Sequence, residues 1–207
     1  MVKRNYHAEL GKIISDIQGK RPTLLLHACC APCSSYVLEY LNEHFDITIY
    51  FYNPNINSEE EFLYRQSEVK RLIGEMPLKN AVKLIETQWR GEEFLSAVKG
   101  FESIREGGER CFKCYELRLR KTAEVCKEGG YDYFCTTLTI SPMKNAEKLN
   151  EIGEEIAKEM GISFLPSDFK KNNGYKRSIE LSKEYSLYRQ NYCGCGFSYK
   201  ESLLREK

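Results

Sequence analysis

Seven of the nine cysteines in this 207-residue chain fall into three short groups. The groups are Cys29, Cys30 and Cys33; Cys111 and Cys114; and Cys193 and Cys195. Residues 1–7 lack the apolar segment of a signal peptide, so we expect a cytoplasmic protein. In that compartment clustered cysteines are typical of metal binding or redox catalysis rather than of structural disulfides.

The first group lies in a turn between a predicted strand and a predicted helix, where α/β folds usually place their chemistry. Backbone N–H groups at a helix start favour negative charge and lower the pKa of a thiol. Neighbouring side chains in extended chain point to opposite sides, so Cys29 and Cys30 reach one small ion only awkwardly. A cluster with several iron atoms suits diverging neighbours better.

The second group, Cys111-x-x-Cys114, opens a predicted helix and is a strong chelate geometry for zinc, an iron–sulfur cluster or a dithiol. It follows a polar, glycine-containing loop rather than a strand, which favours metal. A tetrahedral zinc site made with Cys30 and Cys33 is the alternative. That zinc site would leave Cys29 and the third group unused.

The third group, Cys193-Gly194-Cys195, is spaced to form a small, strained disulfide of the labile, catalytic kind. Its alternative role is to supply extra metal ligands. The two isolated cysteines, Cys126 and Cys135, are predicted to be small buried hydrophobic residues.

Two further residues lie near the expected site. His27 precedes the first cysteines and is predicted to be a core histidine rather than a catalytic one. Asp168 follows the last predicted strand and could ligate a second metal or move a proton. The chain has no P-loop, no G-x-G-x-x-G and no Ser/His/Asp arrangement, which disfavours kinases and dinucleotide dehydrogenases.

Hydrophobic periodicity predicts alternating strands and helices. Strands are expected at residues 23–28, 46–52, 81–87, 131–137 and 162–165. Helices are expected at residues 5–19, 34–44, 58–73, 91–100, 111–127, 142–160 and 174–187. This alternation predicts an α/β fold: a parallel sheet of about five strands with helices on both faces and the cysteine-rich site at its carboxyl edge. We expect a single α/β domain over 1–207, with a helical extension at 1–20 and a tail at 188–207 that folds onto the site.

The chain carries a net charge of +1, but its basic residues are unevenly placed. Residues 99–121 hold seven Lys/Arg and four Glu, and residues 168–207 hold nine Lys/Arg and five Asp/Glu. A basic rim around the cysteines would suit a polyanionic substrate, although solvated helix faces explain such counts equally well. No apolar run approaches the length of a membrane span, so no membrane partner is expected.

Four motifs resemble the signatures of the epoxyqueuosine reductase QueH family. They are His-Ala-Cys-Cys-Ala-Pro-Cys-Ser (27–34), Arg-Cys-Phe-Lys-Cys-Tyr-Glu-Leu-Arg (110–118), Ser-Asp-Phe-Lys-Lys-Asn-Asn-Gly-Tyr (167–175) and Tyr-Arg-Gln-Asn-Tyr-Cys-Gly-Cys (188–195). The resemblance runs from about residue 22 to residue 199. The strand and helix pattern is also similar to the Rossmann-like HUP folds, several of which act on tRNA.

The resemblance implies an activity and a division of labour among the cysteines. Members of the family reduce epoxyqueuosine to queuosine at the wobble base of tRNA. In the family, the Cys-Cys pair and the C-x-x-C pair ligate a [4Fe–4S] cluster. The resemblance therefore implies that the ligands here are Cys29, Cys30, Cys111 and Cys114. The C-x-C pair, Cys193 and Cys195, corresponds to a redox-active disulfide, which an external electron donor would have to reduce.

Other residues follow as hypotheses from this scheme. Cys33 is left over and could serve a second, mononuclear iron together with Asp168 or the tail cysteines. The tRNA anticodon loop offers unstacked bases and phosphates to aromatic and basic side chains. The candidates are Tyr115, Tyr175 and Tyr192 for stacking, and Lys170, Lys171, Arg177 and Arg189 for phosphate.

Three other functions fit part of the pattern. A zinc-stabilised, non-enzymatic nucleic-acid-binding module predicts bound zinc and no chromophore. A protein that only transfers electrons would need neither the C-x-C pair nor the basic segments. An ATP-using tRNA sulfur-insertion enzyme would carry a Ser-Gly-Gly-x-Asp-Ser type loop after the first strand, where this chain has cysteines instead.

Overall fold

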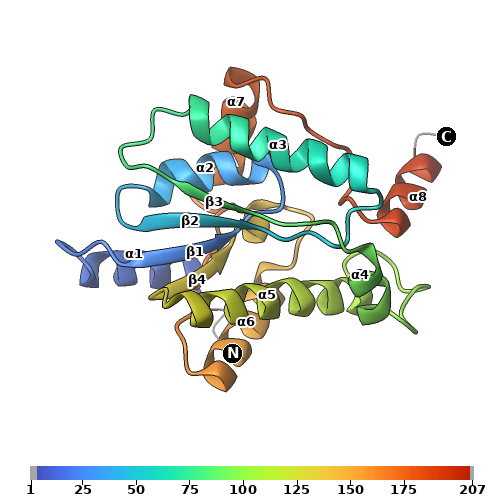
Figure 1. Ribbon diagram of the computed structural model, residues 1–207, viewed down its shortest axis with the longest axis horizontal. Helices are drawn as coiled ribbons and strands as arrows, with labels where there is room; N and C mark the ends of the chain where they lie inside the picture. Colours follow the sequence, from blue (N-terminus) through green and yellow to red (C-terminus); the bar gives the residue numbers. More distant parts are fainter. Residues whose placement is uncertain (1–3, 206–207) are drawn as a thin grey trace.

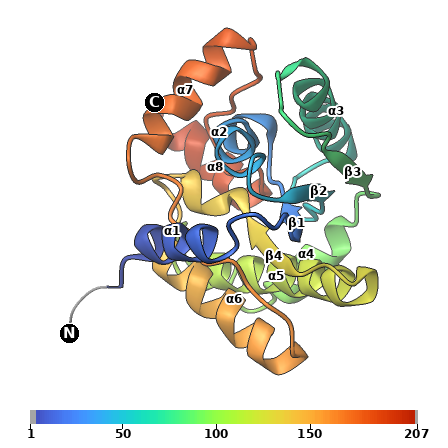
Figure 2. The same cartoon turned by 90° about the vertical axis from the view of Figure 1, so that its left-hand side faces the viewer.

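A parallel four-stranded sheet lies at the centre of the computed structural model, which describes residues 4–205, and helices cover both of its faces (Figures 1 and 2). The strand order is β3-β2-β1-β4. The strands are β1 (Thr23–His27), β2 (Asp46–Phe51), β3 (Lys83–Glu86) and β4 (Tyr133–Thr136). The helices are α1 (Tyr6–Asp16), α2 (Ala31–Leu41), α3 (Glu59–Glu75), α4 (Gly91–Ala97), α5 (Glu109–Gly129), the 3₁₀ helix η1 (Thr137–Ile140), α6 (Ala146–Met160), α7 (Gly174–Glu184) and α8 (Gly196–Arg205).

Strand β1 is buried on both faces, and its successive side chains alternate between two separate hydrophobic cores. Leu24 and Leu26 pack with apolar residues of α2 and α3, whereas Leu25 packs with those of α5 and α6. Figure 2 shows these two helix layers above and below the sheet. A strand that is covered on both faces is expected to have a continuous apolar sequence, and residues 24–26 have one. The predicted α/β class, with a parallel sheet between helices, is therefore confirmed.

The fifth predicted strand is reduced to a single parallel bridge between Phe134 and Phe164. Phe134 donates its N–H to the carbonyl of Ser163, and its own carbonyl accepts from Leu165. The next N–H that could extend the ladder, that of Ser167, donates instead to Asn150 Oδ1 of α6, so the pairing stops there.

The helices also differ from the sequence-based expectation, most clearly at α6 and α8. Helix α6 begins at Ala146 rather than at Pro142, because the side chain of Asn145 accepts the N–H of Lys148 and caps the helix there. Helix α8 is not predicted at all. It is held by tertiary contacts, with the ring of Phe197 against that of Phe94 and beneath the guanidinium of Arg110.

The tail between α7 and α8 crosses the carboxyl edge of the sheet. Its Gly194 carbonyl accepts the backbone N–H of Asn57 at 2.9 Å, and Gly194 itself has a φ of +117°. Tyr192 lies beneath the guanidinium of Arg65, 5.3 Å from its ring centroid. These contacts bring residues 192–195 over the loops that follow β1 and β2. Among the helices of residues 4–205, none is long and apolar enough to cross a membrane.

Candidate functional site

A cavity of about 200 Å³ opens at the carboxyl edge of the sheet. Its walls include Cys29, which follows β1, Asn53, which follows β2, and Leu138, which follows β4. Cys193 of the tail lines it as well. This is the edge at which open α/β sheets bind their ligands, and the fold brings sulfur to it from two distant segments.

Cys29, Cys30 and Cys33 form one compact sulfur group, with their three Sγ atoms within 4.8 Å of one another. Helix α2 explains the arrangement, because Cys30 is its N-cap residue and Cys33 lies in its first turn. The Cys29 and Cys30 sulfurs are 3.8 Å apart. Hydrogen bonding from the other two thiols, together with the Arg118 charge, holds the pKa of Cys29 well below its usual value. The same bonding raises the pKa of Cys30 to about 12 and that of Cys33 above its usual range.

Arg118 carries a positive charge into this buried region. Its side chain is 2% exposed, donates to Asn53 Oδ1 at 2.5 Å and to His27 Nε2 at 3.2 Å, and lies 4.0 Å from Cys114 Sγ. Burial opposes the charged guanidinium, but negative charge on Cys114 and Cys29 raises its pKa. The ion pairs of the described residues include no carboxylate partner for it. The Cys29 sulfur, whose pKa is lowered, therefore supplies compensating charge for Arg118.

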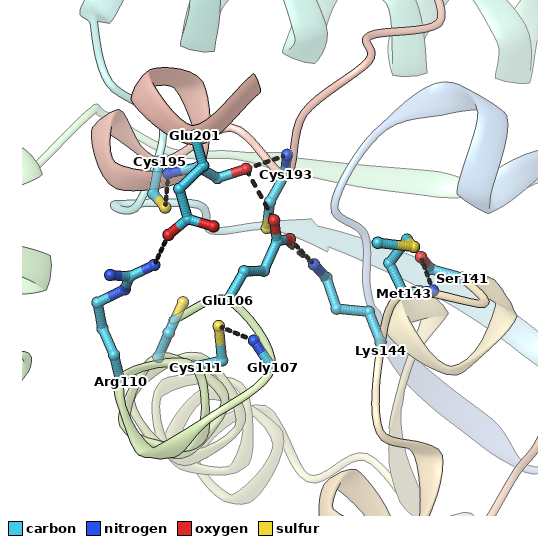
Figure 3. A network of polar contacts seen from close by, with 12 residues as sticks. Glu106, Gly107, Arg110, Cys111, Ser141, Met143, Lys144, Cys193, Cys195 and Glu201 are labelled. Carbon is cyan, nitrogen blue, oxygen red and sulfur yellow. Dashed lines mark hydrogen bonds and ion pairs between the residues drawn. The ribbon is translucent and has the colours of Figure 1, made fainter. Parts of the chain in front are cut away.

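Cys111 and Cys114 lie in the first two turns of α5 and are both buried. The N–H of Gly107 donates to Cys111 Sγ at 3.3 Å (Figure 3). Burial raises the pKa of both thiols, to about 11 for Cys114. Cys29 packs against the apolar cluster that contains Cys111. Among the described residues, the sulfur group close enough to share one metal ion is Cys29, Cys30 and Cys33. Cys111 and Cys114 lie outside that group, with Arg118 between Cys29 and Cys114.

Cys193 meets a buried lysine. Figure 3 shows Lys144 extending from the segment before α6 to Cys193, and its Nζ donates to Cys193 Sγ at 2.9 Å. Glu106 lies 3.4 Å from the same Nζ. Burial opposes the charged ammonium, but its interactions with the Cys193 sulfur and with Glu106 raise the pKa of Lys144 above its ordinary value. The result is a buried ion pair directed at one sulfur of the tail.

Cys195 has a different environment from Cys193. It is 7% exposed and packs in a small apolar cluster with Phe94, Val98 and Cys114. Burial raises the pKa of its thiol to about 12. The tail pair therefore has one sulfur at the cavity and one against an α5 cysteine.

Further cations and aromatic rings surround the opening. Arg65, 2% exposed and paired with Glu61, lines the cavity together with Arg189 and the rings of Tyr175 and Tyr192. Two stacking candidates from the sequence thus lie at the cavity. The third, Tyr115, is 2% exposed, so the expectation that it could stack on RNA is wrong.

The remaining predicted site residues lie elsewhere. Asp168 pairs with Lys170 at 2.7 Å and lines a separate hollow beside α1, so the structure does not bring its carboxylate to Cys33. Arg177 forms ion pairs with Glu39 on α2. Three residues that were predicted to be buried are fully buried: His27, Cys126 and Cys135. Burial, then the Arg118 charge, lowers the pKa of His27 to about 3, so its imidazole is neutral.

Sequence reasoning missed two charged residues of the site. Arg118 follows Cys114 by four residues, a spacing that puts both on one face of a helix, and this signal could have found it. Lys144 is 49 residues from Cys193, and nothing local to either residue indicates that they meet.

Comparison with known proteins gives one consistent result. The family model described as epoxyqueuosine reductase QueH matches residues 24–201. Proteins with this name are 45% identical over 202 residues in Staphylococcus epidermidis (95% of this chain, 85% of the relative) and 46% identical over 182 residues in Streptococcus pyogenes (87% and 71%). The relative from Thermotoga maritima is 35% identical over 185 residues (89% and 93%). The chain belongs to the epoxyqueuosine reductase QueH family, a family of oxidoreductases.

Proposed function

We propose that this protein reduces the epoxide of epoxyqueuosine, at the wobble position of tRNA, to the alkene of queuosine. One observation carries the proposal: the tail places Cys193 on the wall of the cavity that Cys29, Cys30 and Cys33 line. A dithiol and a sulfur-rich metal site thereby share one opening. Names of relatives support the same substrate.

The proposed reaction balances with the two tail thiols. Removing the epoxide oxygen breaks two C–O bonds, forms the carbon–carbon double bond and releases water. This requires two electrons and two protons. Cys193 and Cys195 supply both when their thiols become a disulfide, because each sulfur gives up one electron and one proton. An external reductant must then convert the disulfide back to two thiols before the next turnover.

Cys29, Cys30, Cys111 and Cys114 are the residues that would hold a [4Fe–4S] cluster. Their donors are all sulfur, which suits iron–sulfur ligation. The buried Arg118 between Cys29 and Cys114 fits an anionic group at this place, since its compensating charge comes from sulfur. A bound cluster would supply one-electron transfer and a Lewis-acidic iron. A second, mononuclear iron would draw on Cys33, with Asp168 as a ligand only once its pairing with Lys170 breaks.

The surroundings of the cavity suit an anticodon loop. Tyr175 and Tyr192 offer faces to an unstacked base, and Arg189 offers charge to phosphate. A tRNA substrate also places the reaction in the cytoplasm.

We also infer a Rossmann-like fold class, because the order β3-β2-β1-β4 matches the first four strands of a doubly wound sheet. In this proposal residues 1–207 act as one domain, to which residues 1–20 add a helical extension and residues 188–207 a tail that carries the redox pair.

The proposed function is tested by measuring whether the protein converts epoxyqueuosine in tRNA to queuosine. Protein purified without oxygen and reconstituted with iron and sulfide is incubated with tRNA that contains epoxyqueuosine and with a chemical reductant. Digestion and mass spectrometry of the nucleosides then measure queuosine. We expect the wild type to form queuosine and Cys193→Ser to form none while its fold is unchanged. Absence of product with wild type, or full turnover by Cys193→Ser, would contradict the proposal.

A further inference from the structure

The two tail thiols are not equivalent. Cys193 is half-buried and lines the cavity, whereas Cys195 is 7% exposed and packs between α4 and α5. A molecule in the cavity can therefore meet the sulfur of Cys193 directly. It would have to displace part of the tail to meet Cys195.

Cys193 is also the thiol that a fixed polar network surrounds. Its N–H donates to Ser198 Oγ at 2.8 Å, and Ser198 Oγ donates to Glu106 at 3.3 Å. Glu106 pairs with Lys144, and Lys144 donates to Cys193 Sγ. The network thus closes on itself and ties the backbone and the sulfur of Cys193 to one ammonium group (Figure 3).

The position of Lys144 is set by the chain around it. Its N–H donates to the carbonyl of Ser141 in a turn after η1, and Asn145 next to it caps α6. The side chain is 9% exposed, so its charge has little water to stabilise it. Burying an ammonium is costly unless charged partners compensate it, and Cys193 and Glu106 are the partners present.

We propose that Lys144 is a positioning residue that holds the Cys193 sulfur at the wall of the cavity, so that Cys193 reacts first and Cys195 closes the disulfide. This inference rests on the proposed function, which supplies the two-electron step. Cys193 forms a bond to one epoxide carbon as the first C–O bond breaks. Cys195 then attacks the Cys193 sulfur, so that the S–S bond forms as the C–S bond and the second C–O bond break, and the oxygen leaves as water with the two thiol protons. Lys144 contributes by fixing the direction of the Cys193 sulfur through the 2.9 Å hydrogen bond.

The experiment compares labelling rates in the reduced, cofactor-loaded full chain. Iodoacetamide is added for increasing times, and peptide mass spectrometry follows Cys193 and Cys195 separately. The variants are Lys144→Met, which keeps length without charge, and Lys144→Arg, which restores the charge. Lys148→Met, on the nearby α6 surface where Lys148 pairs with Glu151, is the matched control.

We expect Cys193 to be labelled well before Cys195 in wild type and in Lys148→Met. Lys144→Met should slow labelling of Cys193 roughly tenfold or more, since the variant loses the charge-assisted hydrogen bond that holds this sulfur at the cavity. Lys144→Arg should recover most of the rate. Lys144→Gln gives the same comparison should the methionine variant not fold.

Three results would overturn the inference: labelling of Cys193 in Lys144→Met at the rate of Lys148→Met, equally slow labelling in Lys144→Arg, or faster labelling of Cys195. Labelling requires no tRNA, so its outcome is separate from that of the turnover assay. If wild type labels as expected but forms no queuosine, the proposed function fails and the asymmetry of the pair stands.

Discussion

The cysteines at the starts of α2 and α5, the core half of the site, and Cys193 and Cys195, its tail half, are held in place in different ways. The cysteines of the α2 and α5 starts lie on regular helices, pack against the sheet and surround the buried Arg118. The tail cysteines lie at and before the start of α8, and polar contacts to Lys144, Ser198 and Arg65 hold that segment. The core half is therefore part of the packed interior, whereas the tail half is docked onto it.

This difference matches two different chemical tasks. A metal cluster needs ligands that keep their places, and helix starts at the edge of a packed sheet provide them. A redox pair must meet substrate, form a disulfide and then meet a reductant. A segment held by separable polar contacts can do this without disturbing the core.

The largest expected effect is on the core half. Arg118→Met removes the buried cation beside Cys29 and Cys114 and leaves Asn53 Oδ1 without its donor. Breaking a buried charge compensation by removing one partner costs about 3–5 kcal/mol. We expect a loss of that size in the free energy of unfolding of the loaded protein, measured with denaturant without oxygen, and faster iron loss to a chelator.

Arg120→Met is the matched control, two residues along the same helix. Arg120 is about one-third exposed and pairs with Glu116 and Glu159 at the surface, where ion pairs contribute about 0–1 kcal/mol. Equal stability and equal iron retention in the two variants would show that Arg118 does not compensate sulfur charge.

A smaller effect is expected in the tail. Gly194→Ala puts a side chain on a residue with φ +117°, and the new Cβ would lie 2.9 Å from Nη1 of the buried Arg65. Such strain costs on the order of 1–3 kcal/mol. We expect faster hydrogen exchange and faster proteolysis over residues 188–205, with no change in metal content.

Gly196→Ala serves as the control, because a Cβ there meets only Asn57 Cβ at 3.9 Å. If Gly194→Ala and Gly196→Ala exchange at the same rate, the tail is not held through Gly194. If Gly194→Ala loses metal, the two halves are not separable.

The smallest effect concerns the anchor of α8. Glu201 on α8 accepts from Arg110 at 3.1 Å, and it is about one-third exposed. Because the carboxylate is partly in water, Glu201→Gln should destabilise the docked helix by about 1 kcal/mol. Thermal unfolding followed by circular dichroism should show a lowered midpoint, and salt should reduce the difference from wild type. An unchanged midpoint at low salt would mean that the apolar contact of Phe197 alone holds α8.

The core half could be predicted from sequence because its signals are local. The apolar run before Cys29 marks a strand, and the spacing of Cys111 and Cys114 places them one turn apart. From sequence, Cys33 is separated from the cluster ligands and assigned to a second iron or a zinc site, whereas the first turn of α2 brings its sulfur next to those of Cys29 and Cys30. The helix start at Ala31, three residues earlier than expected, accounts for this difference.

The tail half could not be predicted because tertiary contacts decide it. Helix α8 is short and depends on the rings of Phe94 and Phe197 and on Arg110. The meeting of Lys144 with Cys193 depends on how η1, α6 and the tail pack together. The reduction of the fifth strand to one bridge is also a tertiary effect, because the Ser167 N–H bonds to Asn150 of α6 instead of to β4.

The central claim is that one set of cysteines holds the cofactor and the other carries the electrons. Iron, zinc and acid-labile sulfide are measured in wild type, Cys111→Ser and Cys193→Ser after identical reconstitution without oxygen. The account predicts about four irons and four sulfides per chain in wild type and in Cys193→Ser, with absorbance near 400 nm, and a large loss in Cys111→Ser. Zinc in place of iron, or equal iron loss in Cys193→Ser, would contradict it.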